Sequence, residues 1–213
     1  MTATDDLFPM IAAHRRRTAD LIQGLSEADA RTPSLCSDWT VHQVAAHLTM
    51  PFSLSLPGMV VGMVRHRGRF DSFNRAWAVR TAGARSPAEL AAYLRSHAEH
   101  RFTPPGLGPG APLTDVLVHS LDISVPLGRD NPLEPAHVDA SLAFVCDPGA
   151  SRGFVPSGRL AGLRLICTDS AFELGEGHEV RGPGAALLLA LTGRRRGLDD
   201  LSGDGVDVLR SRF

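Results

Sequence analysis

The chain has 213 residues, of which 43% are hydrophobic and 21% are charged, a composition typical of a folded globular protein with a sizeable core. Its 22 basic residues nearly balance its 23 acidic residues, which excludes a global attraction to nucleic acid or to anionic lipid. Its three cysteines are too few and too scattered for a disulfide framework. No run of about 18 apolar residues is present to span a membrane, and the N-terminus lacks a secretory segment. We therefore expect a soluble cytoplasmic protein that binds neither nucleic acid nor membrane.

All 22 basic residues are arginines. The absence of lysine excludes two common chemistries, because neither a Schiff-base lysine nor a phosphate-binding loop lysine is available.

Helical patterns dominate the first 150 residues. Thr40 with Gln43, and Ser86 with Glu89, have the spacing of capping boxes, in which side chains satisfy the free N–H groups of a first helical turn. A polar stretch, SEADARTPSLCSD, interrupts the pattern before the first of these boxes. The apolar stretch that follows Pro51 has no clear period. We expect helices over residues 5–25, 40–51, 70–82, 86–102, 113–127 and 135–146, with Gly128 ending the fifth.

The pattern changes after Asp147, where the segment PGASRGFVPSGR has the composition of a linker. Beyond it, LRLICTD, AFELG and GHEVRG are typical of short strands, and GPGAALLLALTGRRRG is typical of a helix. We therefore predict an α+β fold with two domains. Residues 1–150 are expected to form a bundle of four or five helices, and residues 152–213 a small α/β domain.

Asp115 and His119 are four residues apart on the predicted helix 113–127, so they lie on one face, one turn from each other. A carboxylate and an imidazole at this spacing can bind one divalent cation. His47, near the end of an earlier helix, is the candidate third ligand. Two histidines and one carboxylate would leave coordination positions open, which is typical of catalytic sites.

Simpler interpretations remain open for each of these residues. Asp115, His119 and Asp122 also suit the solvated face of an amphipathic helix, and His47 also suits a hydrogen-bonded interior position. If the metal is present, Asp122 is placed to orient His119 or a ligand water.

The segment CSDWTVHQVAAHL resembles the signature of the mycothiol-dependent maleylpyruvate isomerase family, whose N-terminal domain is a DinB-like four-helix bundle. In that family this signature leads to a metal-binding histidine, which falls on His47. The later segment DVLVHSLDISVPLG matches the motif that supplies the other ligands, at Asp115 and His119. The C-terminal segments GLRLICTD and GHEVRGPGAALLLALTGR resemble the small α/β domain of the family.

The resemblance implies a metal-dependent enzyme with mycothiol as its thiol co-substrate. The divalent cation, expected to be zinc with nickel as an alternative, would activate the thiol as a thiolate for attack on a small electrophile. The enzyme would then be a thiol transferase or an isomerase. Maleylpyruvate isomerase itself has a glutamate where this chain has Asp115, so the shorter side chain requires either a closer approach of the helix to the metal or a bridging water. The isomerase also uses an arginine, for which Arg69, Arg75 and Arg80 are candidates here by rough position.

Arg194, in the Leu-Thr-Gly-Arg ending, is the candidate cofactor-binding residue, because arginine binds carboxylates in a bidentate manner. The run 194–196 also suits a solvated cluster at a helix C-terminus. Cys36 is expected to be a free buried thiol, and His97 and His100 are expected to lie on the surface.

A different class of function is compatible with the same residues. The bundle would then be a non-enzymatic metal-binding module that acts in stress response or sensing. Thiol-dependent turnover separates the two functions, because only the enzyme would show it. The oligomeric state and the electrophile are not encoded in any motif that we find.

Overall fold

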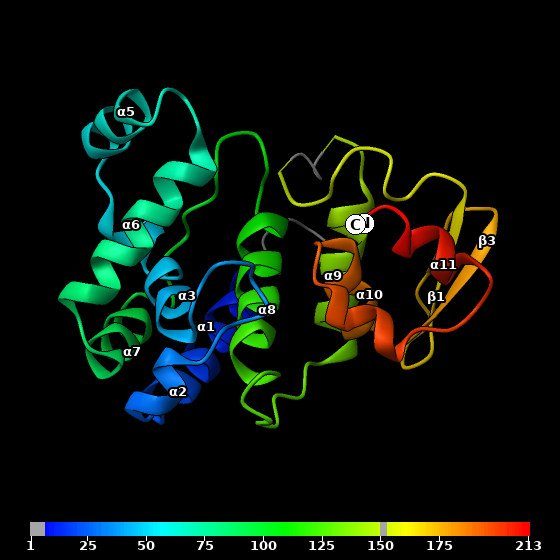
Figure 1. The fold of residues 1–213 in the computed structure, drawn as a ribbon, viewed down its shortest axis with the longest axis horizontal. Coiled ribbons are helices and arrows are strands. Elements are labelled where there is room, and N and C mark those ends of the chain that lie inside the picture. Colours follow the sequence, from blue (N-terminus) through cyan, green and yellow to red (C-terminus); the bar gives the residue numbers. More distant parts are fainter. Residues whose placement is uncertain (1–6, 150–152) are drawn as a thin grey trace. The chain divides into compact units, whose positions relative to one another are not determined.

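The computed structural model describes residues 7–149 and 153–213. Its internal contacts define two units (Figure 1). The first consists of Met1–Phe102 and His119–Asp130, and the second of Thr103–Val118 and Asn131–Phe213. Helix α8 (Gly110–Ser124) therefore contributes to both units. The predicted boundary between domains 1–150 and 152–213 lies outside the described residues, and this division into domains stays a prediction.

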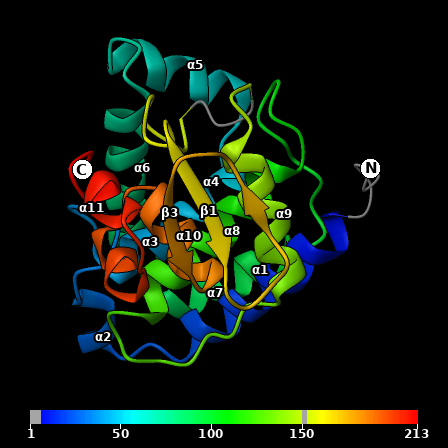
Figure 2. The same ribbon diagram turned by 90° about the vertical axis from the view of Figure 1, so that its right-hand side faces the viewer.

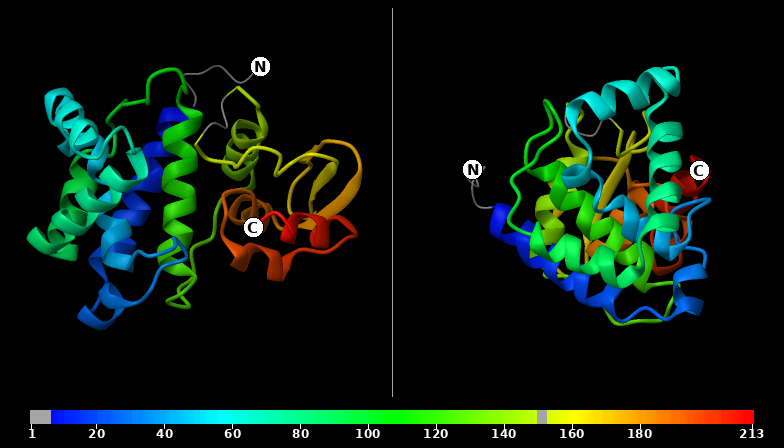
Figure 3. Two further views of the ribbon diagram at one scale, coloured as in Figure 1. Left: turned by 45° about the horizontal axis from the view of Figure 1, so that its top comes forward. Right: turned by 90° about the vertical axis from the view of Figure 1, so that its left-hand side faces the viewer.

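The first unit is helical, as Figures 1 and 3 show. Helices α1 and α7 pack against each other, as do α3 and α6. Buried residues of these helices form one hydrophobic core, with Ile123 of α8 among them. The helices of this unit are α1 (Leu7–Gln23), α2 (Glu27–Arg31), α3 (Val41–His47), α4 (Met50–Ser53), α5 (Leu56–Arg65), α6 (Phe70–Ala84) and α7 (Pro87–Ser96).

Capping boxes begin the helices at two predicted positions. The Thr40 hydroxyl accepts a hydrogen bond from the Gln43 amide at 3.3 Å, and the Thr40 amide donates to the Gln43 side chain at 3.0 Å. Ser86 and Glu89 make the same reciprocal pair at the start of α7. Helix α3 ends at His47 rather than continuing to Pro51. Pro51 instead lies in the first turn of α4, where its missing N–H costs nothing.

Three segments depart from the predicted helices. The polar stretch after α1 contains the short helix α2, which begins with a capping box of Ser26 and Asp29. Helix α7 ends at Ser96 instead of extending to residue 102. Helix α8 begins at Gly110 and ends at Ser124, earlier at both ends than predicted. Gly128 (φ +61°) follows it in the left-handed conformation that glycine adopts without strain.

The second unit contains a three-stranded sheet of order β2–β1–β3, formed by β1 (Leu163–Cys167), β2 (Glu173–Leu174) and β3 (His178–Gly182). The first two strands are antiparallel, whereas β1 and β3 are parallel, with Leu165 opposite Val180. Helix α10 (Gly184–Leu191) packs against one face of the sheet (Figure 2) and against α9 (Pro135–Cys146). The 3-10 helix η2 (Arg195–Asp200) and helix α11 (Gly205–Arg210) complete the unit and were not predicted.

The predicted fold class is therefore confirmed: a mainly helical N-terminal part is followed by a small α/β part. Within the described residues no helix combines the length and the apolar character needed to cross a membrane.

Candidate metal centre

His47, Asp115 and His119 lie close together in the structure. Each offers a ligand atom, and these atoms all lie within 4.8 Å of one another. The centroids of the two imidazole rings are 4.7 Å apart, at an interplanar angle of 76°. His47 is the last residue of α3, and both histidines belong to the first unit. Asp115 lies one turn before His119 on the same helix, so α8 fixes the position of its carboxylate relative to that imidazole.

The imidazole of His119 is oriented by a buried carboxylate. Its Nδ1 atom lies 2.8 Å from Oδ2 of Asp122, whose side chain has no exposed surface. His119 itself is only 8% exposed. These two residues therefore do not lie on a solvated helix face, which was the alternative interpretation. With Nδ1 donating to Asp122, the Nε2 atom of His119 is left as the metal-binding nitrogen.

The imidazole of His47 is oriented by an amide. Its Nδ1 atom lies 2.8 Å from Oδ1 of Asn74 in α6. The amide oxygen accepts the Nδ1 proton, which again leaves Nε2 as the ligand atom. Asn74 could not be predicted from the sequence, because nothing in the spacing of α6 relates this residue to α3. Only the packing of α3 against α6 brings the two side chains together.

Trp39 forms an apolar wall beside both histidines. Its ring lies 5.1 Å from that of His47 and 6.3 Å from that of His119, and it is only 9% exposed. A turn before α3 holds the Trp39 backbone, with its carbonyl accepting from Ser34 and its amide donating to Cys36. An apolar wall of this kind lowers the local dielectric and strengthens the interactions of charged groups beside it.

The donor set fits a divalent cation such as zinc. Imidazole nitrogens and a carboxylate oxygen bind zinc at about 2.0 to 2.2 Å, which places the ligand atoms about 3 to 4 Å apart. In the structure the ligand atoms lie within 4.8 Å of one another. The shorter side chain of Asp115 is thus long enough to reach the two histidines. Three protein ligands would leave at least one coordination position for a substrate.

Comparison with known proteins finds a family similarity in the N-terminal part of the chain. The model of the mycothiol maleylpyruvate isomerase N-terminal domain matches residues 11–104. This segment is therefore similar to the N-terminal domain of that family, over somewhat less than half of the chain. The match includes His47 and ends before Asp115 and His119. No curated protein matches the sequence.

Two solved structures share the fold of this chain. One is a mycothiol-dependent maleylpyruvate isomerase, with a TM-score of 0.55 and 18% identity over 96% of each chain. The other is a histidine-to-alanine mutant of a mycothiol-dependent maleylpyruvate isomerase, with a TM-score of 0.56 and 17% identity over 96% of each chain. Together with the family match, these similarities support the expectation that the chain is an enzyme.

Arg194, predicted to bind a cofactor, lies in the second unit at the N-terminal end of η2. Its half-buried guanidinium donates to the carbonyl oxygen of Thr192 at 2.6 Å. Its cofactor-binding role stays a prediction. Of the other candidate arginines, Arg75 pairs with Asp38 at 2.9 Å on the surface, and Arg69 and Arg80 are exposed.

The remaining candidates take no part in the metal group. Cys36 is half-buried and is not part of a disulfide bond. His100 is exposed, as predicted, whereas His97 is half-buried and contacts two aromatic rings. Its ring centroid lies 5.4 Å from that of Phe52 and 4.2 Å from that of Tyr93. The surface prediction for His97 is therefore wrong.

Proposed function

We propose that the chain is a mycothiol-dependent enzyme, and that His47, Asp115 and His119 hold the divalent cation on which its activity depends. The product is either the S-conjugate of a small electrophile or its isomer. The observation that carries this proposal is the meeting of three ligand side chains from two helices, with both imidazoles oriented by hydrogen bonds. Zinc is the expected cation, and nickel would also accept this donor set.

When bound, the cation would lower the pKa of a coordinated thiol and so supply a thiolate near neutral pH. The chain contributes the surroundings for this step. His47 and His119 present their Nε2 atoms, and Asp115 contributes negative charge to the same group. Asn74 and Asp122 fix the tautomers of the two imidazoles, while Trp39 excludes water from one side.

The test combines metal analysis with a thiol panel on the native protein. We expect about one divalent cation per chain, as zinc sites of this kind hold a single ion. Turnover of an electrophile such as maleylpyruvate or a chlorinated aromatic should depend on mycothiol and be much slower with glutathione. His119→Ala should lose both the cation and the turnover, with its circular dichroism spectrum retained.

His66→Ala is the matched control, because His66 also lies in the first unit but outside the metal group, with its Nδ1 atom 2.8 Å from the Ser72 hydroxyl. This variant should keep the cation and the turnover. Native protein without a stoichiometric cation would contradict the metal assignment. A bound cation without turnover for any thiol and electrophile would instead favour the non-enzymatic binding module.

A further inference from the structure

The second unit contains a cavity of about 840 Å³ that the proposed function does not use. Its size falls within the range of cavities that bind small organic molecules. The end of α9, the segment that precedes β1 and the residue after α10 form its walls. The residues around it are Cys146, Pro148, Gly153, Phe154, Val155, Pro156, Ser157, Gly158, Arg159, Leu160, Ala161 and Thr192.

Arg159 places a buried positive charge on this cavity. The residue is only 6% exposed. Its Nη atoms donate to the carbonyl oxygens of Ala190 at 3.3 Å and of Arg212 at 3.1 Å. Its Nε atom is buried and has no hydrogen-bond partner among the described residues. A buried donor without an acceptor is costly, and a buried charge without a counter-ion is more so.

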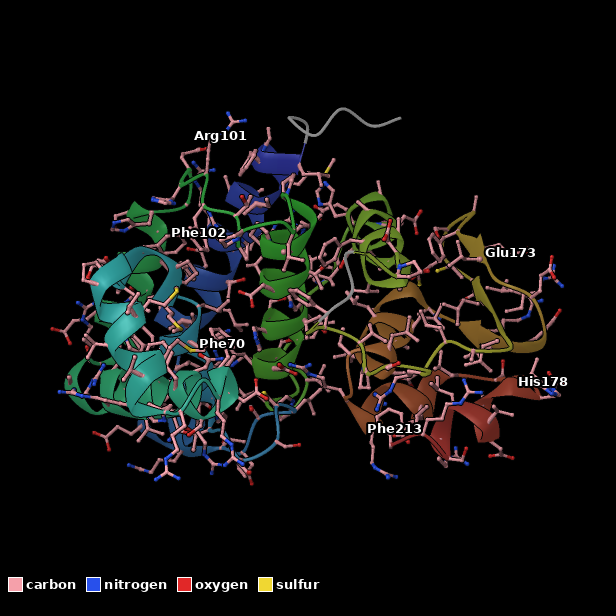
Figure 4. The ribbon with its side chains drawn as sticks, turned by 90° about the horizontal axis from the view of Figure 1, so that it is seen from above. Phe70, Arg101, Phe102, Glu173, His178 and Phe213 are labelled. Atoms are coloured by element: carbon pink, nitrogen blue, oxygen red, sulfur yellow. The ribbon has the colours of Figure 1, made fainter. Side chains whose placement is uncertain are left out.

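The neighbouring charges are also positive. The Phe213 ring (labelled in Figure 4) lies 4.3 Å from the guanidinium carbon of Arg159 and 5.2 Å from that of Arg195. Arg212 donates to the carbonyl oxygens of Arg159 and Ala161, both at 2.7 Å. In the described part of the chain, none of these three arginines pairs with a carboxylate side chain. Burial, and then the charge of Arg195, lower the pKa of Arg159, as expected for an uncompensated cation.

Most of the remaining wall is apolar. Phe154, Val155, Pro156 and Leu160 contribute side chains that suit a hydrocarbon rather than a hydrated inorganic ion. We propose that this cavity binds an organic carboxylate with an apolar body, the carboxylate facing Arg159 and the hydrocarbon part lying against these four residues. An arginine that meets a carboxylate forms charge-assisted hydrogen bonds, which are about twice as strong as neutral ones.

The test uses hexanoate as the probe on the full chain, followed by calorimetric titration and by the shift in thermal unfolding. Hexanoate should bind saturably and raise the midpoint of unfolding. Hexanamide has the same hydrocarbon body without the charge. Its affinity should be lower by at least about tenfold, because it loses the charge-assisted hydrogen bonds. Inorganic phosphate, which has the charge without the body, should also bind more weakly. Equal binding of all three compounds would overturn the proposal.

Arg159→Gln should weaken hexanoate binding by about tenfold or more. Arg210→Gln is its control, because it removes the same charge from an exposed pair with Asp207 in the same unit. Arg159 also hydrogen-bonds to two backbone carbonyl groups, so Arg159→Gln could impair folding. A second pair of variants therefore tests the cavity without changing Arg159. Val155→Glu adds a carboxylate at the cavity wall, which repels the carboxylate of hexanoate, and should abolish hexanoate binding. Val155→Gln adds a neutral side chain of the same shape as glutamate and should retain binding. Unchanged binding in Val155→Glu, or in a folded Arg159→Gln, would overturn the proposal.

Discussion

The Nδ1 atom of His119 lies 2.8 Å from a carboxylate oxygen of Asp122, and the Asp122 side chain has no exposed surface. A buried carboxylate in this position holds the imidazole in one orientation and makes its other nitrogen a better ligand.

Asp122→Asn should therefore weaken zinc binding by about 10- to 100-fold, as is typical when a group that orients a ligand histidine is changed. Competition with a chromophoric chelator measures this affinity. Asp130→Asn is the control, because Asp130 is an exposed carboxylate just beyond the same helix. If the two variants bind zinc equally well, Asp122 has no role in the metal group.

Asn74 provides a second test of the same principle, at His47. Asn74→Leu removes the oxygen that accepts the Nδ1 proton of His47, and we expect zinc affinity to fall by about tenfold. Asn74→Asp retains an acceptor and adds a negative charge, so its affinity should equal or exceed that of the wild type. The same chelator competition measures both variants. A similar loss in Asn74→Asp would show that the position matters for packing rather than for the hydrogen bond.

His42 is expected to make stability depend on pH. Burial lowers the pKa of His42 below its ordinary value of 6.5, although its hydrogen bond to the Arg85 carbonyl partly opposes the shift. The unfolded chain therefore takes up a proton at a higher pH than the folded chain. The stability contribution of neutral His42 is complete above about pH 6.5 and is lost as the pH falls toward the lowered pKa.

Urea unfolding of the wild type and of His42→Gln at a series of pH values measures this effect. The free energy of unfolding of the wild type should fall more steeply below about pH 6.5 than that of the variant. Parallel curves would show that other groups account for the acid sensitivity.

A side chain at Gly62 in α5 is expected to lower the stability of the protein. A Cβ atom there would lie 2.2 Å from Cε2 of Phe73, whose ring is buried against Met50 and Trp77. Gly62→Ala should therefore lower the free energy of unfolding by about 1 to 3 kcal/mol, as overpacking does. Gly83→Ala is the control, because no atom lies within 4 Å of the added carbon in α6. That variant should be more stable than the wild type by about 0.5 to 1 kcal/mol.

The sequence predicted those parts of the fold and site that depend on local spacing. The capping boxes at Thr40 and Ser86 located two helix starts, because the interaction is made within four residues. The turn between Asp115 and His119 followed from helical geometry alone. His47 was a candidate third ligand because it lies near the end of its predicted helix, and the resemblance to the family supported that choice. No local pattern relates residues so far apart in the chain.

Other features could not be predicted from local sequence patterns, because tertiary packing determines them. Asn74 meets His47 only through the contact of two helices. Helix α2 and helix α11 are too short for a clear hydrophobic period, so their sequences did not distinguish them from loops. Conversely, the helix predicted from the Ser86 capping box to residue 102 ends at Ser96.

The location of α8 has a practical consequence for fragment design. The segment matched by the family model ends at residue 104, so a protein cut to that segment would retain one imidazole of the three-residue group and lose the other two donors. It would also lose Ile123 from the core that α8 completes. Expression of the matched segment alone would thus yield an incomplete bundle, and assays of metal binding should use polypeptides that extend at least through Gly128.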